Sequence, residues 1–225
     1  MIQIYSLQSF RTRVRLVLLV PVLTLWLEAP SLQAQENAGR ILEKVRATYD
    51  GLNALSADFE KEYTWFLAGE KQALAGKLYL KKGDRYRIET DFQTIVTDGK
   101  VVWTYSAEKA QVFIDRMEKS EENPLPRELL MKYTNEFKAE YVRSEKLNEF
   151  DCHVLRLLPR EEDAFLRQVV AWIDKKTSLA VQIEQTDLND NLTVYRLKNI
   201  TLNPNLADQL FTFTIPENTE TIDLR

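Results

Sequence analysis

Hydrophobic and polar positions alternate strictly along the middle of the chain, from residue 74 to residue 105. Between 74 and 80 the even positions are apolar or small, and between 85 and 91 Tyr86 and Ile88 alternate with charged side chains. A period of two is typical of strands that bury one face and expose the other. A meander of this length with one continuous apolar side must curl around a core or around a bound molecule.

Two turn sequences divide this segment into separate strands. Lys82-Gly83-Asp84 follows the first strand, and Asp98-Gly99, the dipeptide favoured by a type I′ hairpin, precedes the last. The strand after Asp98-Gly99 presents one set of side chains on a single face, namely Val101, Trp103 and Tyr105. The pattern therefore predicts consecutive antiparallel strands joined by tight turns.

The segment 37–52 shows helical spacing instead. Its apolar residues fall on one stripe, with charged residues opposite, and the stripe consists of Ile41, Leu42, Val45, Tyr49 and Leu52. Gly51 is expected to end this helix. The sequence thus predicts one amphipathic helix ahead of the sheet.

Further strands are expected on both sides of a break in the β pattern. They are predicted at 54–67, 111–117, 138–144, 152–158, 167–174, 179–187 and 192–200. The break contains Asn123-Pro124-Leu125-Pro126, followed by a short helical pattern whose apolar side holds Leu125, Leu129, Leu130 and Tyr133. This insertion is a candidate lid. With no linker-like composition and no internal repeat, we expect one mainly β domain of ten or eleven strands with two helices.

The amino terminus resembles a secretory signal. Three arginines precede an apolar run at 16–27, and small and polar residues follow it in the segment APSLQAQ. A span of a bilayer needs roughly 20 apolar residues, and this run is shorter. We therefore expect residues 1–34 to be a cleaved Sec-type signal peptide, residues 35–225 to form the mature domain, and a periplasm to be its location; an uncleaved anchor is the alternative.

Charge and composition exclude several classes of protein. The formal net charge is −4, and without residues 1–34, which hold three Arg and one Glu, 27 bases face 33 acids. A mildly acidic body argues against nucleic acid as a partner. The single cysteine rules out an internal disulfide.

No catalytic constellation stands out, and we expect a protein that is not an enzyme. Cys152 and His153 are the only cysteine and histidine, and as neighbours in a strand they point to opposite faces. Zinc needs three or four ligands, so no metal site and no cofactor are expected. Six glycines form no phosphate-binding loop. Glu121-Glu122 and Glu161-Glu162-Asp163 are interpreted as solvated charge runs.

The aromatic residues on the apolar side have two interpretations. Tyr86, Trp103, Tyr105 and Phe113 are most simply core residues. However, a curled sheet of ten or so strands is wider than its own side chains easily fill. The spare volume is either plugged by helices or kept for a ligand, and two short amphipathic helices could do the first while permitting the second.

The chain resembles the LolA family of periplasmic lipoprotein carriers in a set of ordered motifs. They are G76-K-L-Y-L80, K82-x-D-R-Y86-R, T97-D-G-K-V-V-W-T-Y105 and F211-T-F-T-I-P216. The likeness spans about residues 40–216. It implies an incomplete antiparallel β-barrel whose helices form a lid over a hydrophobic cavity.

The resemblance also implies partners and site residues. Members take acylated lipoproteins from an inner-membrane ABC-type releasing complex and pass them to an outer-membrane acceptor, and we expect a monomer. On this chain the expected acyl-chain cavity comprises Leu78, Leu80, Tyr86, Ile88, Trp103 and Tyr105. The expected lid and latch comprise Lys82, Leu125, Leu129, Leu130, Ile41 and Val45.

Two departures from the family pattern affect the latch. The family often has Arg-Pro after the second strand, where Lys82-Gly83 stands here, and Tyr86 replaces an aromatic that is commonly Phe. Lysine offers a point charge rather than a planar fork.

Two other functions stay open. One is a carrier or sensor of another lipid or glycolipid on the same fold, and the other is a scaffold with a dry core.

Overall fold

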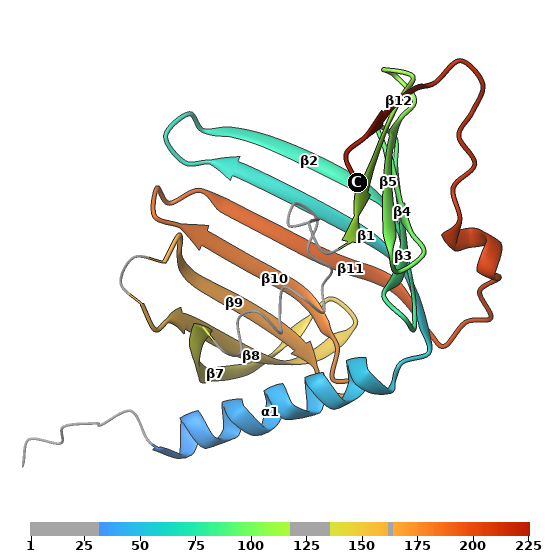
Figure 1. Cartoon of the computed structure of the whole chain (residues 1–225). Coiled ribbons are helices and arrows are strands. Elements are labelled where there is room, and N and C mark those ends of the chain that lie inside the picture. Colours follow the sequence, from blue (N-terminus) through green and yellow to red (C-terminus); the bar gives the residue numbers. More distant parts are fainter. Residues whose placement is uncertain (1–31, 118–135, 162–163) are drawn as a thin grey trace, which may run out of the picture. The chain divides into compact units, whose positions relative to one another are not determined.

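The predicted alternation of strand residues is confirmed in a computed structural model, which describes residues 32–117, 136–161 and 164–225 (Figure 1). These residues belong to one compact unit, Ser31–Arg225. The unit is mainly β, with one N-terminal helix and a single twelve-stranded sheet that does not close on itself. An open antiparallel barrel was the predicted architecture, and the structure confirms it.

The helix α1 spans Leu32–Gly51 and ends at the predicted glycine, although it begins five residues before the predicted start. The strands of the first half of the sheet are β1 (Ala54–Trp65), β2 (Glu70–Lys81), β3 (Arg85–Thr90), β4 (Thr94–Thr97), β5 (Val101–Ser106) and β6 (Gln111–Arg116). Those of the second half are β7 (Phe137–Leu147), β8 (Phe150–Pro159), β9 (Leu166–Asp174), β10 (Ala180–Asp187) and β11 (Leu192–Leu202). A short 3-10 helix, η2 (Asp208–Phe211), and a last strand, β12 (Glu220–Asp223), follow.

The strand order is β12-β6-β5-β4-β3-β2-β1-β11-β10-β9-β8-β7. Within β1–β6 and within β7–β11 chain neighbours pair antiparallel, β6 and β7 lie far apart in the strand order, and β1 joins the two runs by pairing with both β2 and β11. The exception is β12, which lies parallel to β6 at one end of the sheet. The predicted strands included neither β12 nor a separate range for β4, so the count of twelve exceeds the predicted ten or eleven.

Two of the turns meet at glycines. Gly83 and Gly99 both have positive φ, and a Cβ on Gly99 would lie 2.4 Å from the carbonyl oxygen of Gly83. Asp98 does not share the positive φ, so the turn is not type I′. Its carboxylate instead accepts hydrogen bonds from the backbone N–H of Lys100 (2.8 Å) and Val101 (2.9 Å). The hairpin is where the sequence placed it, but a side-chain cap stabilises it.

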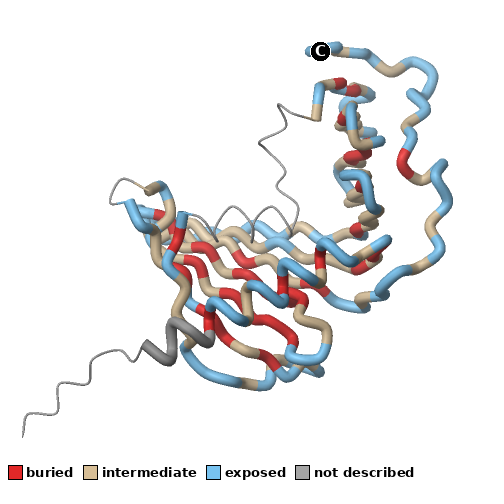
Figure 2. Tube along the Cα trace, turned by 60° about the horizontal axis from the view of Figure 1, so that its bottom comes forward, coloured by how far each residue is buried: buried red, intermediate tan, exposed pale blue. Residues whose placement is uncertain are grey.

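The main core lies between α1 and one face of the sheet, which we call the inner face. Val45 and Tyr49 of α1 are buried in one cluster with Leu55, Leu78 and Leu155 from both halves of the sheet. Figure 2 shows buried positions recurring along the strands beside α1 and exposed positions along the opposite side of the helix. The helix pattern predicted from sequence therefore faces the sheet as expected.

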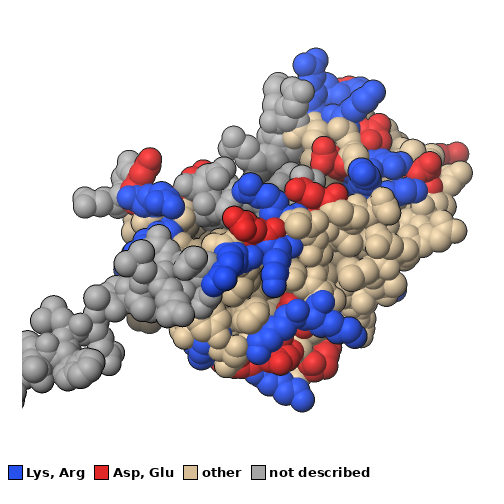
Figure 3. All heavy atoms as spheres, turned by 90° about the horizontal axis from the view of Figure 1, so that it is seen from below, with Lys and Arg blue, Asp and Glu red and all other residues tan. Residues whose placement is uncertain are grey.

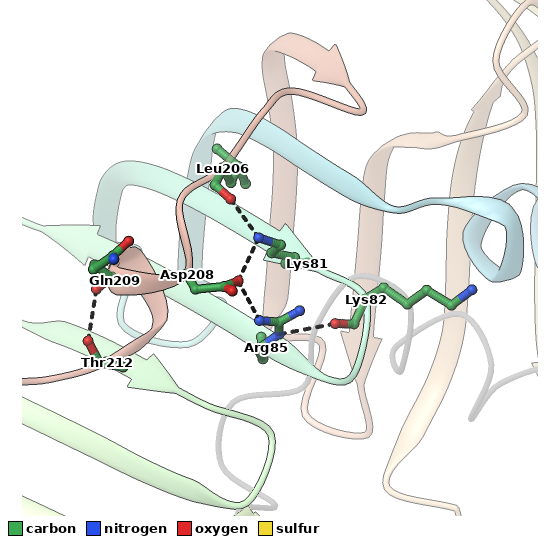
Figure 4. A network of polar contacts seen from close by, with 7 residues as sticks. All are labelled: Lys81, Lys82, Arg85, Leu206, Asp208, Gln209 and Thr212. Atoms are coloured by element: carbon green, nitrogen blue, oxygen red, sulfur yellow. Dashed lines mark hydrogen bonds and ion pairs between the residues drawn. The ribbon is translucent and has the colours of Figure 1, made fainter.

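The opposite, outer face carries a second cover over β2–β6. The segment 203–219, which we call the C-terminal strap, contains η2 and buries Phe211 almost completely. Figure 4 shows its anchor: Asp208 lies 2.7 Å from Lys81 Nζ and 2.7 Å from an Arg85 nitrogen, and Lys81 also donates to the Leu206 carbonyl. These contacts, the one from Lys81 most of all, hold the pKa of Asp208 below its ordinary value.

The predicted lid helix around Leu125, Leu129 and Leu130 lies outside the described residues. Its placement therefore stays a prediction. Among the described residues, α1 is the helix that covers the inner face.

Candidate functional site

Four of the six predicted cavity residues lie together on the inner face. The register pairs Leu80 with Tyr86 and Leu78 with Ile88 across β2 and β3, so all four side chains point the same way. Leu78 and Tyr86 are buried, whereas Leu80 and Ile88 are half-buried and pack against the same cluster. This patch is the centre of the candidate site.

Residues of the helix α1 belong to the same core cluster as the patch. Val45 is fully buried and Ile41 is partly buried against the same cluster, as the lid prediction requires of residues that face the sheet. Tyr49 is also buried there, and desolvation raises the pKa of its hydroxyl well above its ordinary value. The side chains of Ile41, Val45 and Tyr49 are therefore all uncharged near neutral pH.

Trp103 and Tyr105 lie on the outer face, away from the other four. In the register of β4 and β5, Thr97 pairs with Val102 and Val96 with Trp103. Since Tyr86 pairs with Thr97, the even residues of β5 share the inner face and the odd ones do not. Tyr105 instead packs on Phe213 of the strap, with ring centroids 5.4 Å apart. The prediction that Trp103 and Tyr105 share one face fits this register, but their expected place in the cavity does not, because their face is the one on which Phe213 of the strap packs.

Lys82 borders a groove at the end of α1. The groove has a volume of about 690 Å³, and its apolar lining includes Leu52, Leu55, Leu80 and Met117. In Figure 4 the Lys82 side chain extends away from Asp208, while its own carbonyl accepts a hydrogen bond from Arg85 at 3.2 Å. The ammonium is thus free of the strap's anchor and lies on a groove shared by α1 and the β2–β3 turn.

A second groove lies at the far end of β1 and β2, and the sequence reasoning did not assign it. Its volume is about 550 Å³, and its lining includes Tyr63, Trp65, Leu74 and Phe92. The register pairs Lys61 with Leu74 and Tyr63 with Gln72, which places this groove on the inner face as well. The signal in the sequence is the placement of Phe59, Tyr63 and Trp65 at odd positions of β1, which indicates one strand face but not a groove.

Charge is distributed evenly on the side of the molecule that carries α1. The exposed positions of the helix include Arg40, Glu43, Lys44, Arg46 and Asp50. Figure 3 shows basic and acidic side chains interspersed around the helix, next to a broad uncharged surface. No large field of one sign marks this side for nucleic acid.

Cys152 and His153 do not form a catalytic pair. Cys152 belongs to a separate outer-face cluster with Val154 and Trp172, whereas His153 pairs with Ile173 of the inner-face core. Burial raises the pKa of the Cys152 thiol to about 11, and desolvation lowers the pKa of His153. A buried neutral thiol is a poor nucleophile.

The described residues hold neither a cluster of metal ligands nor a helix suited to a bilayer. In those ranges no group of three or more His, Cys, Asp or Glu side chains is arranged to hold a metal ion. Within the same parts of the chain, no helix has both the length and the hydropathy needed to cross a membrane.

Known proteins resemble this chain in sequence and in fold. The model of the family described as outer membrane lipoprotein carrier protein LolA matches residues 50–214. An outer-membrane lipoprotein carrier protein of Haemophilus ducreyi is 29% identical over 173 residues, which cover 76% of this chain and 79% of that protein. The uncharacterized protein MJ0687 of Methanocaldococcus jannaschii is 25% identical over 188 residues, 81% of this chain, and the chain spans about half (53%) of its length.

Among solved structures, that of an uncharacterized conserved protein from Thermus thermophilus superposes with a TM-score of 0.58. The superposition covers 83% of this chain and 99% of that one, at 14% sequence identity. At this identity the similarity concerns the fold alone.

Proposed function

Because this chain belongs to the LolA family of outer membrane lipoprotein carrier proteins, we propose that it shields the acyl chains of lipoproteins and carries them between membranes. The observation that carries the proposal is the inner-face patch of Leu78, Leu80, Tyr86 and Ile88, which belongs to one core cluster with residues of α1. An acyl chain needs a long apolar surface that a movable element covers when it is empty. A sheet that does not close, with one helix across it, supplies such a surface.

Free energies limit how much of the cargo such a protein can bury. Each methylene contributes about 0.8 kcal/mol, so roughly 45 methylenes would nominally approach ~36 kcal/mol on full burial. Non-covalent affinities reach a ceiling near ~20 kcal/mol. A carrier that enclosed every methylene would never release its cargo. We therefore propose partial shielding, with α1 closing over the empty patch and making release favourable.

Loading then requires work from outside, and the proposed source is an inner-membrane ABC-type releasing complex. An outer-membrane acceptor is the proposed recipient. The proposed location is the periplasm, with residues 1–34 removed as a signal peptide. Such a cut falls in the first turn of α1, after only three of its twenty residues, so the helix that covers the patch is kept. The role is that of a binding protein and not of an enzyme.

Substitution of Leu80 by glutamate is expected to weaken binding of a triacylated peptide by about tenfold, because a carboxylate would enter an apolar surface. Tyr79→Glu is the matched control, since Tyr79 is the adjacent half-buried residue on the outer face. Binding is measured with a fluorescent acyl peptide in solution, with folding of each variant checked by circular dichroism. Equal affinity of Leu80→Glu and the wild type would contradict the assignment of the patch.

The same assay tests the latch. If Lys82 holds the closed form from its position on the groove at the end of α1, Lys82→Leu shifts the protein towards the open form and raises the apparent affinity for the acyl peptide. An unchanged affinity would remove Lys82 from the mechanism.

Mass spectrometry of the protein purified from its cell envelope tests compartment and cargo together. The intact mass is expected to correspond to a chain beginning at residue 35, and the organic extract is expected to contain lipoprotein. Free lipid or glycolipid in the extract would favour the alternative cargo, and a protein that repeatedly yields neither would favour a scaffold. An intact mass that retains residues 1–34 would contradict the signal peptide.

A further inference from the structure

Four large apolar side chains are exposed together at one end of the sheet. They come from three turns, β1–β2, β8–β9 and β10–β11, which lie at the same end of their strands (Figure 1). The exposed fractions are 62% for Phe66, 90% for Leu67, 70% for Phe165 and 52% for Leu188. We call this set the apolar edge. Scattered exposed leucines are ordinary on protein surfaces, whereas a cluster of this kind marks an interaction site.

Hydrogen bonds hold the three turns together. The Leu188 N–H donates to the Phe165 carbonyl at 3.2 Å, and the Phe66 N–H donates to Asn191 Oδ1 at 3.0 Å. The Asp187 carboxylate accepts from the backbone N–H of Asn189 (2.8 Å) and of Asn191 (2.9 Å). Several backbone donors of the three turns are thus satisfied within the protein. Turns with satisfied donors enter a poorly hydrated region without the penalty for bare N–H groups.

Two pairs of opposite charges lie beside the apolar edge. Arg167 contacts Asp190 and donates to the Leu188 carbonyl, and Lys71 lies 3.4 Å from Glu62. A surface that recognised a charged protein partner would present unpaired groups of one sign. These two pairs combine both signs, the exposed Glu161 lies in the β8–β9 turn, and the most exposed side chains of the three turns include Leu67 and Phe165.

The apolar edge continues into the inner face. The groove of about 550 Å³ lined by Tyr63, Trp65 and Leu74 begins next to Phe66, and Phe59 on the same strand joins it to the main core. Tyr63 and Trp65 pack edge to face with centroids 4.3 Å apart. An aromatic track, interrupted by Lys61 between Phe59 and Tyr63, therefore runs along β1 from the main core to the exposed turns.

We propose that the apolar edge docks on the surface of a phospholipid bilayer, with its four side chains seated between the headgroups and the first methylenes. Aromatic and leucine side chains on turns with satisfied backbones suit this interfacial zone. The track along β1 then gives an acyl chain a path between the bilayer and the inner face. The path rests on the proposed function, whereas the docking requires no cargo and is tested without it.

The test uses flotation of the protein, purified as its cell produces it, with vesicles of phosphatidylethanolamine and phosphatidylglycerol. Phe66→Ser/Leu67→Ser is expected to reduce the vesicle-bound fraction by about tenfold, because two large side chains no longer leave water. The matched control is Phe113→Ser/Leu224→Ser, which removes one phenylalanine and one leucine that are 39% and 53% exposed at the β6–β12 end. The control is expected to bind like the wild type. An equal loss in both variants, or no loss in the first, overturns the proposal.

Two further readouts identify the bilayer as the partner. Lipids brominated in the upper acyl chain are expected to quench the wild type more than Trp65→Phe, since Trp65 directly precedes the apolar edge. Binding is expected to persist at high salt, because apolar side chains and not ion pairs make the proposed contact. Quenching that is the same with and without Trp65, or a steep salt dependence, would overturn the proposal. The proposal would also be overturned if the Phe66→Ser/Leu67→Ser variant bound vesicles normally but lost binding to a partner protein in detergent.

Acyl-peptide binding in solution separates this inference from the proposed function. The edge variant is expected to bind the peptide as the wild type does, while Leu80→Glu loses peptide binding and keeps vesicle binding. A wild type that binds vesicles but no acyl peptide would refute the carrier role and leave the docking intact. A wild type that binds the peptide but not vesicles would refute the docking and leave the carrier role intact.

Discussion

Replacing Gly76 by alanine is expected to lower the free energy of unfolding by about 3 kcal/mol, the upper end of the range for overpacking. A Cβ at this position would lie 2.0 Å from the backbone carbonyl oxygen of Glu89 in β3 and 2.9 Å from Cε1 of Phe59 in β1. Neither neighbour can move away at low energetic cost, because the Glu89 oxygen belongs to the main chain of the sheet and the Phe59 ring lies on the inner face. Gly76 therefore allows an aromatic ring to cover the strand where a side chain would otherwise stand.

The matched control is Gly39→Ala in α1. No atom comes within 4 Å of a Cβ there, and alanine is the better helix former, so stability is expected to rise by about 0.5–1 kcal/mol. Urea denaturation followed by circular dichroism measures both variants. If the two alanines changed stability in the same direction, the close approach of β1, β2 and β3 at Gly76 would not constrain the fold.

Replacing Phe211 by alanine is expected to lower the free energy of unfolding by about 3 kcal/mol, as for other buried phenylalanines. Phe211 is 1% exposed, and the cations of Lys81 and Arg85 lie 5.9 Å and 5.8 Å from its ring. Its loss leaves a cavity beneath the C-terminal strap and weakens the cover over the outer face of β2–β6.

Phe213→Ala is the control for the strap, and a smaller loss is expected because Phe213 is only half-buried where it meets Tyr105. Thermal and urea unfolding measure both variants. Since the strap lies on the outer face, acyl-peptide binding by folded Phe211→Ala is expected to match the wild type. A large loss of peptide binding without unfolding would mean that the strap belongs to the binding site.

The patch on β2 and β3 could be predicted from sequence because its side chains follow a local rule. Leu78, Leu80, Tyr86 and Ile88 alternate with charged residues, and the register across β2 and β3 adds only which residues stand opposite. The position of α1 could be predicted for the same reason, because its pattern also depends only on spacing along the chain. Its stripe with Ile41 and Val45 has the period of a helix, and the stripe faces the core.

Trp103 and Tyr105 show where that rule ends. On β5 both faces carry apolar residues, Val102 on one and Trp103 on the other, so alternation does not say which face meets α1. The answer comes from the strap, which lies about a hundred positions later in the chain and covers the odd residues. The same holds for the apolar edge, because residues of three separate turns meet only when the strands are aligned.

What the sequence determined by itself was most of the elements: one amphipathic helix, the chain order of the strands apart from β4 and β12, and the side-chain faces of the strands with a strict period of two. These follow from the local geometry of helices and strands, in which spacing along the chain fixes direction in space. The tertiary structure alone decided which face of β5 is inner, that β12 pairs parallel with β6, and that Phe66, Leu67, Phe165 and Leu188 form one exposed edge. Each of these depends on contacts between segments far apart in the chain, which no local pattern records.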